Sequence, residues 1–214
     1  MKRIIFILVM LVSEVSCGYS ERLVKTFEYH FKLEDFPIID SGNGVVRIVC
    51  NVKDFGLLTM AAYIPEKRMT IAIPGKLRLD TMYCEGERIL LMENPKIQGV
   101  RIFCMHKCEN KEEKQEISPV SKKCLVETYG NVLRDIDIDD FGVMAYVYIT
   151  FAPFQYDETD DKLYFYPDCK LVFEFEDDPD APIEPVLPFY QAPLEFIENP
   201  EDAIEIMRSN GIME

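Results

Sequence analysis

The sequence is poor in the residues on which many enzymes and nucleic-acid readers rely. Among its 214 residues there is no tryptophan, and only two are histidine. Its 23 lysines and arginines stand against 38 aspartates and glutamates, which gives a formal net charge of −15. Binding to a phosphate backbone or a charged membrane surface needs clustered basic residues, so this charge argues against both. With 48% hydrophobic and 29% charged residues, the composition is that of a globular chain.

Motifs of catalysis are also missing. The chain has no Gly-x-Ser-x-Gly elbow, no Walker loop and no Gly-x-Gly-x-x-Gly fingerprint. Two histidines still permit a Ser/His/Asp or Cys/His set, but no neighbouring pattern supports one. We therefore predict no catalytic residue, no metal and no cofactor. The absence of an Asn-x-Ser/Thr sequon indicates that N-glycosylation is not expected.

Long apolar runs are absent, so no membrane span is predicted. The first residues instead have the order of a secretory leader, with a short basic start, the apolar run 4–12 and then small residues. We expect residues 1–18 to be a signal peptide and the protein to be secreted and extracellular. A bacterial lipoprotein is the alternative, because Val15–Cys17 resembles the end of a lipobox, although Glu14 replaces its aliphatic residue.

Cysteine usage agrees with an oxidising compartment. If cleavage follows Cys17, an even number of cysteines remains, which in a secreted protein predicts three disulfides. The six are Cys50, Cys84, Cys104, Cys108, Cys124 and Cys169. Six cysteines allow 15 connectivities, and the sequence does not choose among them. Cys104-Met-His-Lys-Cys108 also suggests zinc, but no CxxC pair or second nearby histidine completes a four-ligand site.

Hydrophobic residues alternate with polar ones in many short segments. Residues 27–33 have this two-residue period, which is typical of a strand with one buried face. Glycine and proline interrupt such segments at short intervals, which favours an antiparallel architecture. We therefore predict a mainly β fold, an antiparallel β-sandwich or pair of sandwiches, over residues 19–176. A division into two β subdomains near 109–118 stays open.

The last residues differ in composition. Residues 177–214 combine a proline-rich segment with a short C-terminal helix, for which Asn199 is the cap, Pro200 the first helical residue and Gly211 the terminator. About ten residues of helix are marginal alone, so we expect this helix to dock on the rest of the protein.

Acidity is concentrated in the last third. Residues 18–134 carry 18 basic and 16 acidic side chains, whereas residues 135–214 carry 3 basic and 21 acidic ones. Such a segment attracts a basic extracellular protein or peptide through long-range electrostatics. The predicted binding residues are Asp135, Asp137, Asp139, Asp140, Asp157, Glu158, Asp160, Asp161, Glu174, Glu176, Asp177 and Asp178. A merely solubilising acidic face is the alternative interpretation.

Residues 135–142 also have enough carboxylates for calcium. They fail the EF-hand pattern, because Asp140 stands where that loop needs glycine and Tyr146 where it needs glutamate. We favour a strand in which Ile136 and Ile138 point inward and the aspartates point outward.

Four segments resemble the secreted transthyretin-like proteins of nematodes. They are Val100–Cys104, Val126–Tyr129, Asp139–Gly142 and Leu163–Cys169, and the resemblance is confined to residues 99–176. The last segment is similar to that family's strand ending in His-Asp-Cys, although Pro167 replaces the histidine. The resemblance implies a small extracellular β-sandwich that binds ligands or bridges surfaces, with no catalytic residues.

These observations predict a secreted, disulfide-bonded β-sandwich that engages a basic extracellular partner through its acidic last third. Two alternatives stay open. One is a secreted hydrolase that uses carboxylates or His106, and the other is a structural extracellular component, for which the proline-rich segment is the hint.

Overall fold

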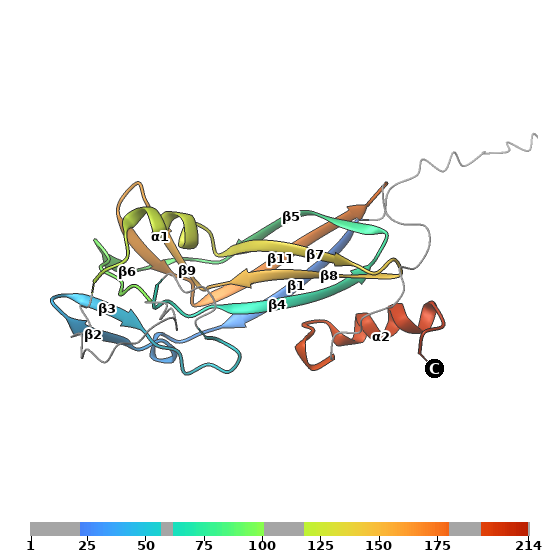
Figure 1. Ribbon diagram of the computed structural model, residues 1–214, viewed down its shortest axis with the longest axis horizontal. Coiled ribbons are helices and arrows are strands. Elements are labelled where there is room, and N and C mark those ends of the chain that lie inside the picture. Colours follow the sequence, from blue (N-terminus) through green and yellow to red (C-terminus); the bar gives the residue numbers. More distant parts are fainter. Residues whose placement is uncertain (1–21, 57–61, 101–117, 180–193, 214) are drawn as a thin grey trace, which may run out of the picture.

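Antiparallel strands make up most of the structure, which is a computed structural model describing residues 22–56, 62–100, 118–179 and 194–213. Its elements in chain order are β1 Leu23–His30, η1 Leu33–Asp35, β2 Ile38–Gly42, β3 Val45–Ile48, β4 Lys67–Pro74, β5 Leu77–Glu85, β6 Ile89–Glu93, α1 Lys122–Tyr129, β7 Leu133–Asp140, β8 Met144–Phe151, β9 Phe154–Asp157, β10 Lys162–Phe165, β11 Asp168–Asp177, η2 Leu194–Phe196 and α2 Pro200–Ser209. The predicted mainly β fold with a short C-terminal helix is confirmed. Figure 1 shows β1, β4, β5, β7, β8 and β11 running along the long axis of the molecule.

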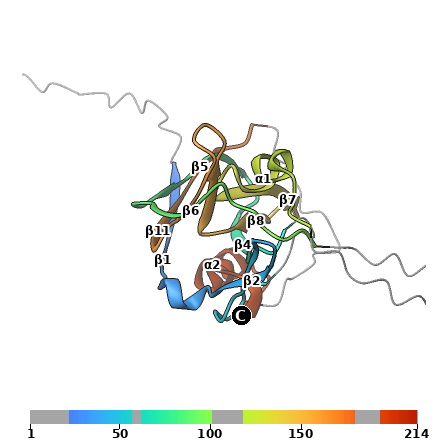
Figure 2. The ribbon, with the colours of Figure 1, turned by 90° about the vertical axis from the view of Figure 1, so that its left-hand side faces the viewer.

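Two three-stranded sheets pack face to face to form the sandwich. One has the order β1–β11–β5 and the other the order β4–β8–β7, and Figure 2 shows them as two layers. Aromatic rings fill the space between them. Phe173 of β11 lies edge-on to Phe27 of β1 at 5.8 Å between ring centroids, and Tyr29 of β1 reaches Phe151 of β8 at 5.1 Å. Burial of these large apolar surfaces stabilises the sandwich.

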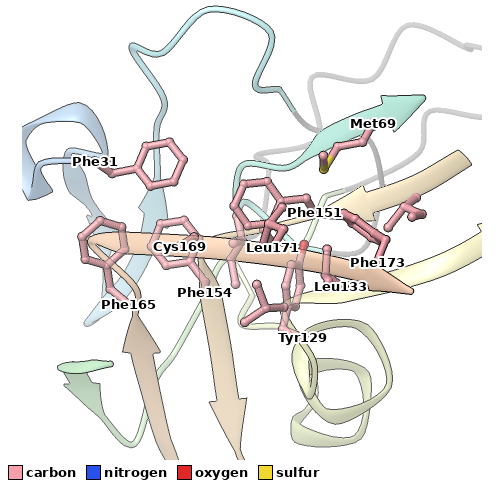
Figure 3. Packing of buried hydrophobic residues seen from close by; sticks show 14 of the residues in the cluster. Phe31, Met69, Tyr129, Leu133, Phe151, Phe154, Phe165, Cys169, Leu171 and Phe173 are labelled. Carbon is pink, nitrogen blue, oxygen red and sulfur yellow. The ribbon is translucent and has the colours of Figure 1, made fainter. Parts of the chain in front are cut away.

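A third sheet closes one end of the sandwich. It has the order β6–β10–β9 and lies beside α1 and the β2–β3 hairpin. Its buried rings continue the same core, because Phe36 packs edge-on against Phe154 at 5.2 Å and against Phe165 at 5.7 Å. Figure 3 shows that this aromatic cluster and the sandwich interior form one continuous hydrophobic core.

A tight hairpin turn and a short helix complete the fold. Asn43 and Gly44 form the turn between β2 and β3, with positive φ angles of 56° and 72°. Helix α1 was not predicted. It begins after Ser121, whose hydroxyl accepts a hydrogen bond from the backbone N–H of Cys124 at 3.2 Å.

The C-terminal helix α2 is confirmed, but Asn199 does not cap it through its side chain. The Asn199 side-chain oxygen instead accepts from the backbone N–H of Ala72 at 2.9 Å, and its amide nitrogen donates to the Ala72 carbonyl at 2.7 Å. The N–H of Glu198 also donates to the Thr70 carbonyl at 2.8 Å. The residues before α2 therefore cover the outer edge of β4, which would otherwise present unpaired backbone groups.

A buried ion pair joins the start of β7 to the residue that precedes β4. Arg134 is bonded to Glu66, and both side chains are almost fully removed from solvent. The Arg134 guanidinium also lies 4.8 Å above the ring of Tyr129, the last residue of α1. The Arg134 guanidinium thus connects the end of α1, the start of β7 and the residue that precedes β4.

We expect Arg134→Met to lower the free energy of unfolding by about 3–5 kcal/mol, because the Glu66 carboxylate would stay buried without its cation. Urea denaturation measures this loss. The control is Lys123→Met, which breaks an exposed pair with Glu127 and should cost about 0.5 kcal/mol at most. Adding Glu66→Leu to Arg134→Met should recover most of the loss, and a single-variant loss as small as the control's would contradict this account.

Candidate functional site

The acidic strand β7 forms one edge of the sheet β4–β8–β7. Register with β8 places Asp137 opposite Tyr148, Asp139 opposite Tyr146, and Ile138 opposite Val147. Because Val147 faces the sandwich interior, the two aspartates share the opposite, outer face of the sheet with the two tyrosines. From Asp135 onward every residue of β7 is exposed.

The two isoleucines of β7 are more exposed than predicted. Ile138 shares the inner face with Val147, as expected, yet 41% of its surface is accessible, and Ile136 is 47% exposed. The reason is their position: β7 is an edge strand, and a register shift between Arg134 and Asp137 bends it where Asp135 adopts a positive φ of 52°. The expectation of inward-pointing isoleucines is thus met in direction for Ile138 but not in burial.

Three carboxylates of β7 have no cationic partner among the described residues. Asp137 and Asp140 accept only backbone hydrogen bonds, from the N–H groups of Ile138 at 3.1 Å and Gly142 at 2.7 Å. Asp139 lies beside the Tyr148 hydroxyl, and burial together with this negative charge raises the pKa of Tyr148. Strand β7 therefore carries three carboxylates without an ion pair in the described part of the chain, and the Arg68 guanidinium is the cation observed nearby, 5.1 Å from the centre of the Tyr148 ring.

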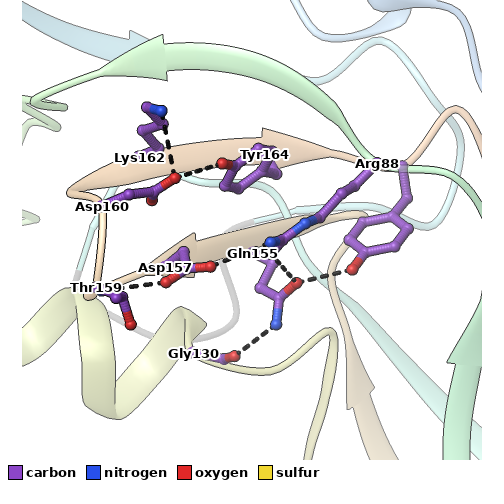
Figure 4. Close-up of polar contacts among 9 residues, drawn as sticks. Arg88, Gly130, Gln155, Asp157, Thr159, Asp160, Lys162 and Tyr164 are labelled. Carbon is purple, nitrogen blue, oxygen red and sulfur yellow. Dashed lines mark hydrogen bonds and ion pairs between the residues drawn. The ribbon is translucent and has the colours of Figure 1, made fainter.

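The second acidic group, at the β9–β10 turn, is largely neutralised by neighbouring bases (Figure 4). Asp157 pairs with Arg88 at 3.1 Å. Asp160 pairs with Lys162 at 3.3 Å and accepts from the Tyr164 hydroxyl at 2.6 Å. Of the predicted residues in this group, Glu158 alone lacks an observed partner in the described part of the chain.

Asp161 completes the neutralised turn. It pairs with Lys122 of α1 and accepts a hydrogen bond from the Tyr156 hydroxyl at 2.8 Å. Both contacts lower the pKa of Asp161, and the hydrogen bond from Lys122 has the larger effect. The carboxylate thus links α1 to the β9–β10 turn and is not available as a free charge.

The third acidic group follows the C-terminal half of β11. Glu176 forms an ion pair with Arg78 at 2.6 Å, and Glu174 lies 3.6 Å from Arg22. Asp177 is opposite Leu77 at the start of β5, and the N–H of Asp178 donates to the Lys76 carbonyl at 2.8 Å. Two of the four acids in this group, Glu174 and Glu176, are thus compensated by bases from the first half of the chain.

The predicted acidic surface is therefore divided between two ends of the molecule. Figure 1 shows the β9–β10 turn at one end and the tips of β7 and β11 at the other. At the second end, the β4–β5 turn lies against the β7–β8 turn, because the N–H of Gly75 donates to the Val143 carbonyl at 3.2 Å and any side chain at Gly75 would collide with the backbone of Gly142. The uncompensated charge concentrates on β7.

The predicted cysteine pairing is not observed among the described residues. Cys50, Cys84, Cys124 and Cys169 are free thiols, while Cys104 and Cys108 lie outside the described residues. Cys50 and Cys124 contact local groups, since the N–H of Val52 donates to the Cys50 sulfur at 3.2 Å and the Cys124 sulfur lies 3.8 Å from the Thr128 hydroxyl.

Other predicted features fall outside the described residues or carry no site. His106, the base of the hydrolase alternative, lies in the undescribed segment 101–117, as do most residues of the subdomain boundary at 109–118. His30 is exposed and contacts Asp168 at 2.8 Å.

Within the described ranges, no three acidic, cysteine or histidine side chains converge as metal ligands. No helix in the described part of the chain is long and apolar enough to cross a membrane.

The fold and this surface define an antiparallel β-sandwich with an acidic free edge. No family model matches the chain, and no curated protein matches it. Among solved structures it is similar to the complex of the RgpB pro- and mature domains of Porphyromonas gingivalis, with 14% identity and a TM-score of 0.51 over 88% of this chain and 95% of that one. A structure on the zymogenic latency of gingipain K from the same organism has 12% identity and a TM-score of 0.38, over 77% of this chain and 97% of that one. At these identities the first likeness shows a shared fold.

The pKa of Tyr156 tests whether its hydroxyl donates to Asp161 at the β9–β10 turn. Burial, then the hydrogen bond to Asp161, raise its pKa to about 12. We expect Asp161→Asn to lower this pKa toward, but not to, the ordinary value of about 10, since burial persists. Titration of labelled tyrosine by NMR measures the shift. Asp160→Asn is the comparison and should lower the Tyr156 pKa less, because Asp160 acts on Tyr156 only through its charge and its hydroxyl partner is Tyr164. An unchanged Tyr156 pKa in Asp161→Asn would contradict the contact.

The raised pKa of Tyr156 also makes the stability of the protein depend on pH. The folded state favours the protonated hydroxyl, so the contribution of Tyr156 to the free energy of unfolding is complete below about pH 10, the pKa in the unfolded chain. This contribution is lost as the pH rises through about 12, the pKa in the folded protein.

Proposed function

We propose that this chain is a secreted binding protein that engages a basic extracellular protein through the outer edge and face of β7. The observation that carries the proposal is the set of three carboxylates, Asp137, Asp139 and Asp140, without a cationic partner in the described residues. In the other two acidic groups, bases already pair with Glu174, Glu176, Asp157, Asp160 and Asp161. A basic partner gains most electrostatic attraction where the negative charge is uncompensated.

Strand addition is the mode of contact that the geometry of β7 favours. The two edges of its sheet differ: residues 198–199 cover the β4 edge, whereas no described residue covers the outer edge of β7. An exposed edge presents unpaired N–H and carbonyl groups on which an extended segment can add. A partner strand with basic residues at alternate positions would place them beside Asp137 and Asp139 and its apolar residues beside Ile138.

The likeness to a pro-domain supports a folded protein as the partner. The solved neighbour is a pro-domain in complex with its mature domain, and this chain matches 95% of that neighbour's length. Secretion rests on the basic, apolar and small order of residues 1–18. The transthyretin-like resemblance also implies an extracellular binding module, and the fold likeness neither depends on it nor tests it.

Neutralising β7 should weaken binding to a basic strand about tenfold. The variant is Asp137→Asn with Asp139→Asn and Asp140→Asn, and the loss corresponds to about 0.5 kcal/mol per exposed charge pair. The probe is a short extended peptide that alternates lysine and valine, and calorimetry at rising salt measures its affinity for the full chain. Binding should fall with salt in the wild type and should be nearly salt-independent in the variant.

A matched control has the same change in net charge. Glu87→Gln, Glu158→Gln and Glu201→Gln remove three exposed acids away from β7, and this triple variant should bind as the wild type does. A peptide of the same composition with its lysines grouped together should bind more weakly than the alternating one. Equal losses in the two triple variants, or no salt-sensitive binding by the wild type, would overturn the proposal.

A further inference from the structure

Two cysteines from distant parts of the sequence lie side by side in the sheet β1–β11–β5. Cys84 of β5 pairs with Leu171 of β11, which is two residues from Cys169, so the two cysteines are diagonal neighbours on one face of the sheet. That face is the inner one, since Leu171 and Cys169 belong to the core. The two thiols are free and in contact with each other.

The two sulfurs differ in access. Cys169 is 2% exposed, and its sulfur lies 3.6 Å from the carbonyl oxygen of Tyr166. Cys84 is only partly buried and lines a pocket of about 360 Å³ together with Gln155 and Tyr166. A small reagent that enters this pocket meets Cys84 first, and Cys169 stands behind it.

The pKa values of the two thiols also differ, and Cys84, the more accessible thiol, is the one that ionises more readily. A hydrogen bond from the Cys169 thiol lowers the pKa of Cys84, and that contact, followed by burial, raises the pKa of Cys169. The thiolate is the nucleophile in disulfide exchange. Access and ionisation therefore both single out Cys84 as the attacking sulfur.

We propose that Cys84 and Cys169 are an ordered dithiol site that a disulfide reagent converts into a cross-strand disulfide between β5 and β11. In the first step the Cys84 thiolate attacks one sulfur of the reagent, forms a mixed disulfide and expels one thiolate. In the second step Cys169 gives up its proton, attacks the Cys84 sulfur and expels the second thiolate. The two protein thiols lose two electrons and two protons, and the reagent disulfide is reduced to two thiols.

The bond requires the two sulfurs, which are already in contact, to approach to the disulfide length of about 2.0 Å. It would fasten the edge strand β5 to the central strand β11 beside the pocket. Closing the loop from residue 84 to residue 169 restricts the unfolded chain, so the oxidised protein should melt about 10 °C higher than the reduced one.

Oxidised glutathione is the probe for the full chain, and peptide mapping by mass spectrometry is the readout. In the wild type we expect one cross-linked peptide pair that contains Cys84 and Cys169, lighter by two hydrogens than the reduced pair. In Cys169→Ser, Cys84 should remain as a stable mixed disulfide with glutathione, because the resolving thiol is gone. In Cys84→Ser, Cys169 should stay unmodified because it is buried. Cys124→Ser is the control and should leave the cross-link unchanged.

Alkylation of the reduced wild type provides a second measurement that needs no variant. Brief exposure to a maleimide should label Cys84 well before Cys169. Simultaneous labelling, a cross-link of Cys84 or Cys169 to any other cysteine, or an unmodified Cys84 in folded Cys169→Ser would overturn the proposal. None of these outcomes depends on the partner of β7, so the two proposals fail separately.

Discussion

The ion pair between Glu66 and Arg134 is the contact on which the position of the acidic edge depends. Both side chains are almost fully removed from solvent, and the Arg134 guanidinium lies over the ring of Tyr129. Arg134 is the second residue of β7, so its pair with Glu66 determines where this strand leaves the core and becomes exposed. A buried charge pair of this kind specifies one arrangement, because separating it would leave an unpaired charge in a medium of low polarity. The register shift that follows Arg134 then exposes the remainder of the strand.

Charge along the chain and charge on the surface are different quantities in this protein. The sequence divides into a nearly neutral first part and a strongly acidic last third, but the sandwich interleaves strands from both. Arg78 of β5 meets Glu176 of β11, and Lys122 of α1 meets Asp161 of the β9–β10 turn. Exposed pairs of this type contribute little to stability. Their effect is to cancel part of the acidity locally, whereas three carboxylates on β7, those of Asp137, Asp139 and Asp140, have no ion pair among the described residues.

The two proposed sites share one side of the sandwich. Strand β7 is an edge of one sheet and β5 an edge of the other. The pocket beside Cys84 is lined both by β5 and by Leu133 at the start of β7, and farther along Ile138 faces inward yet is exposed. On the edge of the sheet β4–β8–β7 opposite to β7, Glu198 and Asn199 cover β4. A disulfide at Cys84 would stabilise the β5 wall of this open side without altering the charges of β7.

The sequence by itself determined the fold class and the C-terminal helix, because alternation with a period of two and the signals at Pro200 and Gly211 are local properties. It also showed how the acids are distributed along the chain. Tertiary structure decided which acids are neutralised, that Asn199 binds the edge of β4, and that Cys84 lies against Cys169. Each of these depends on which distant strands become neighbours, and strand pairing between distant segments is set by the packing of the whole core, which no local pattern encodes.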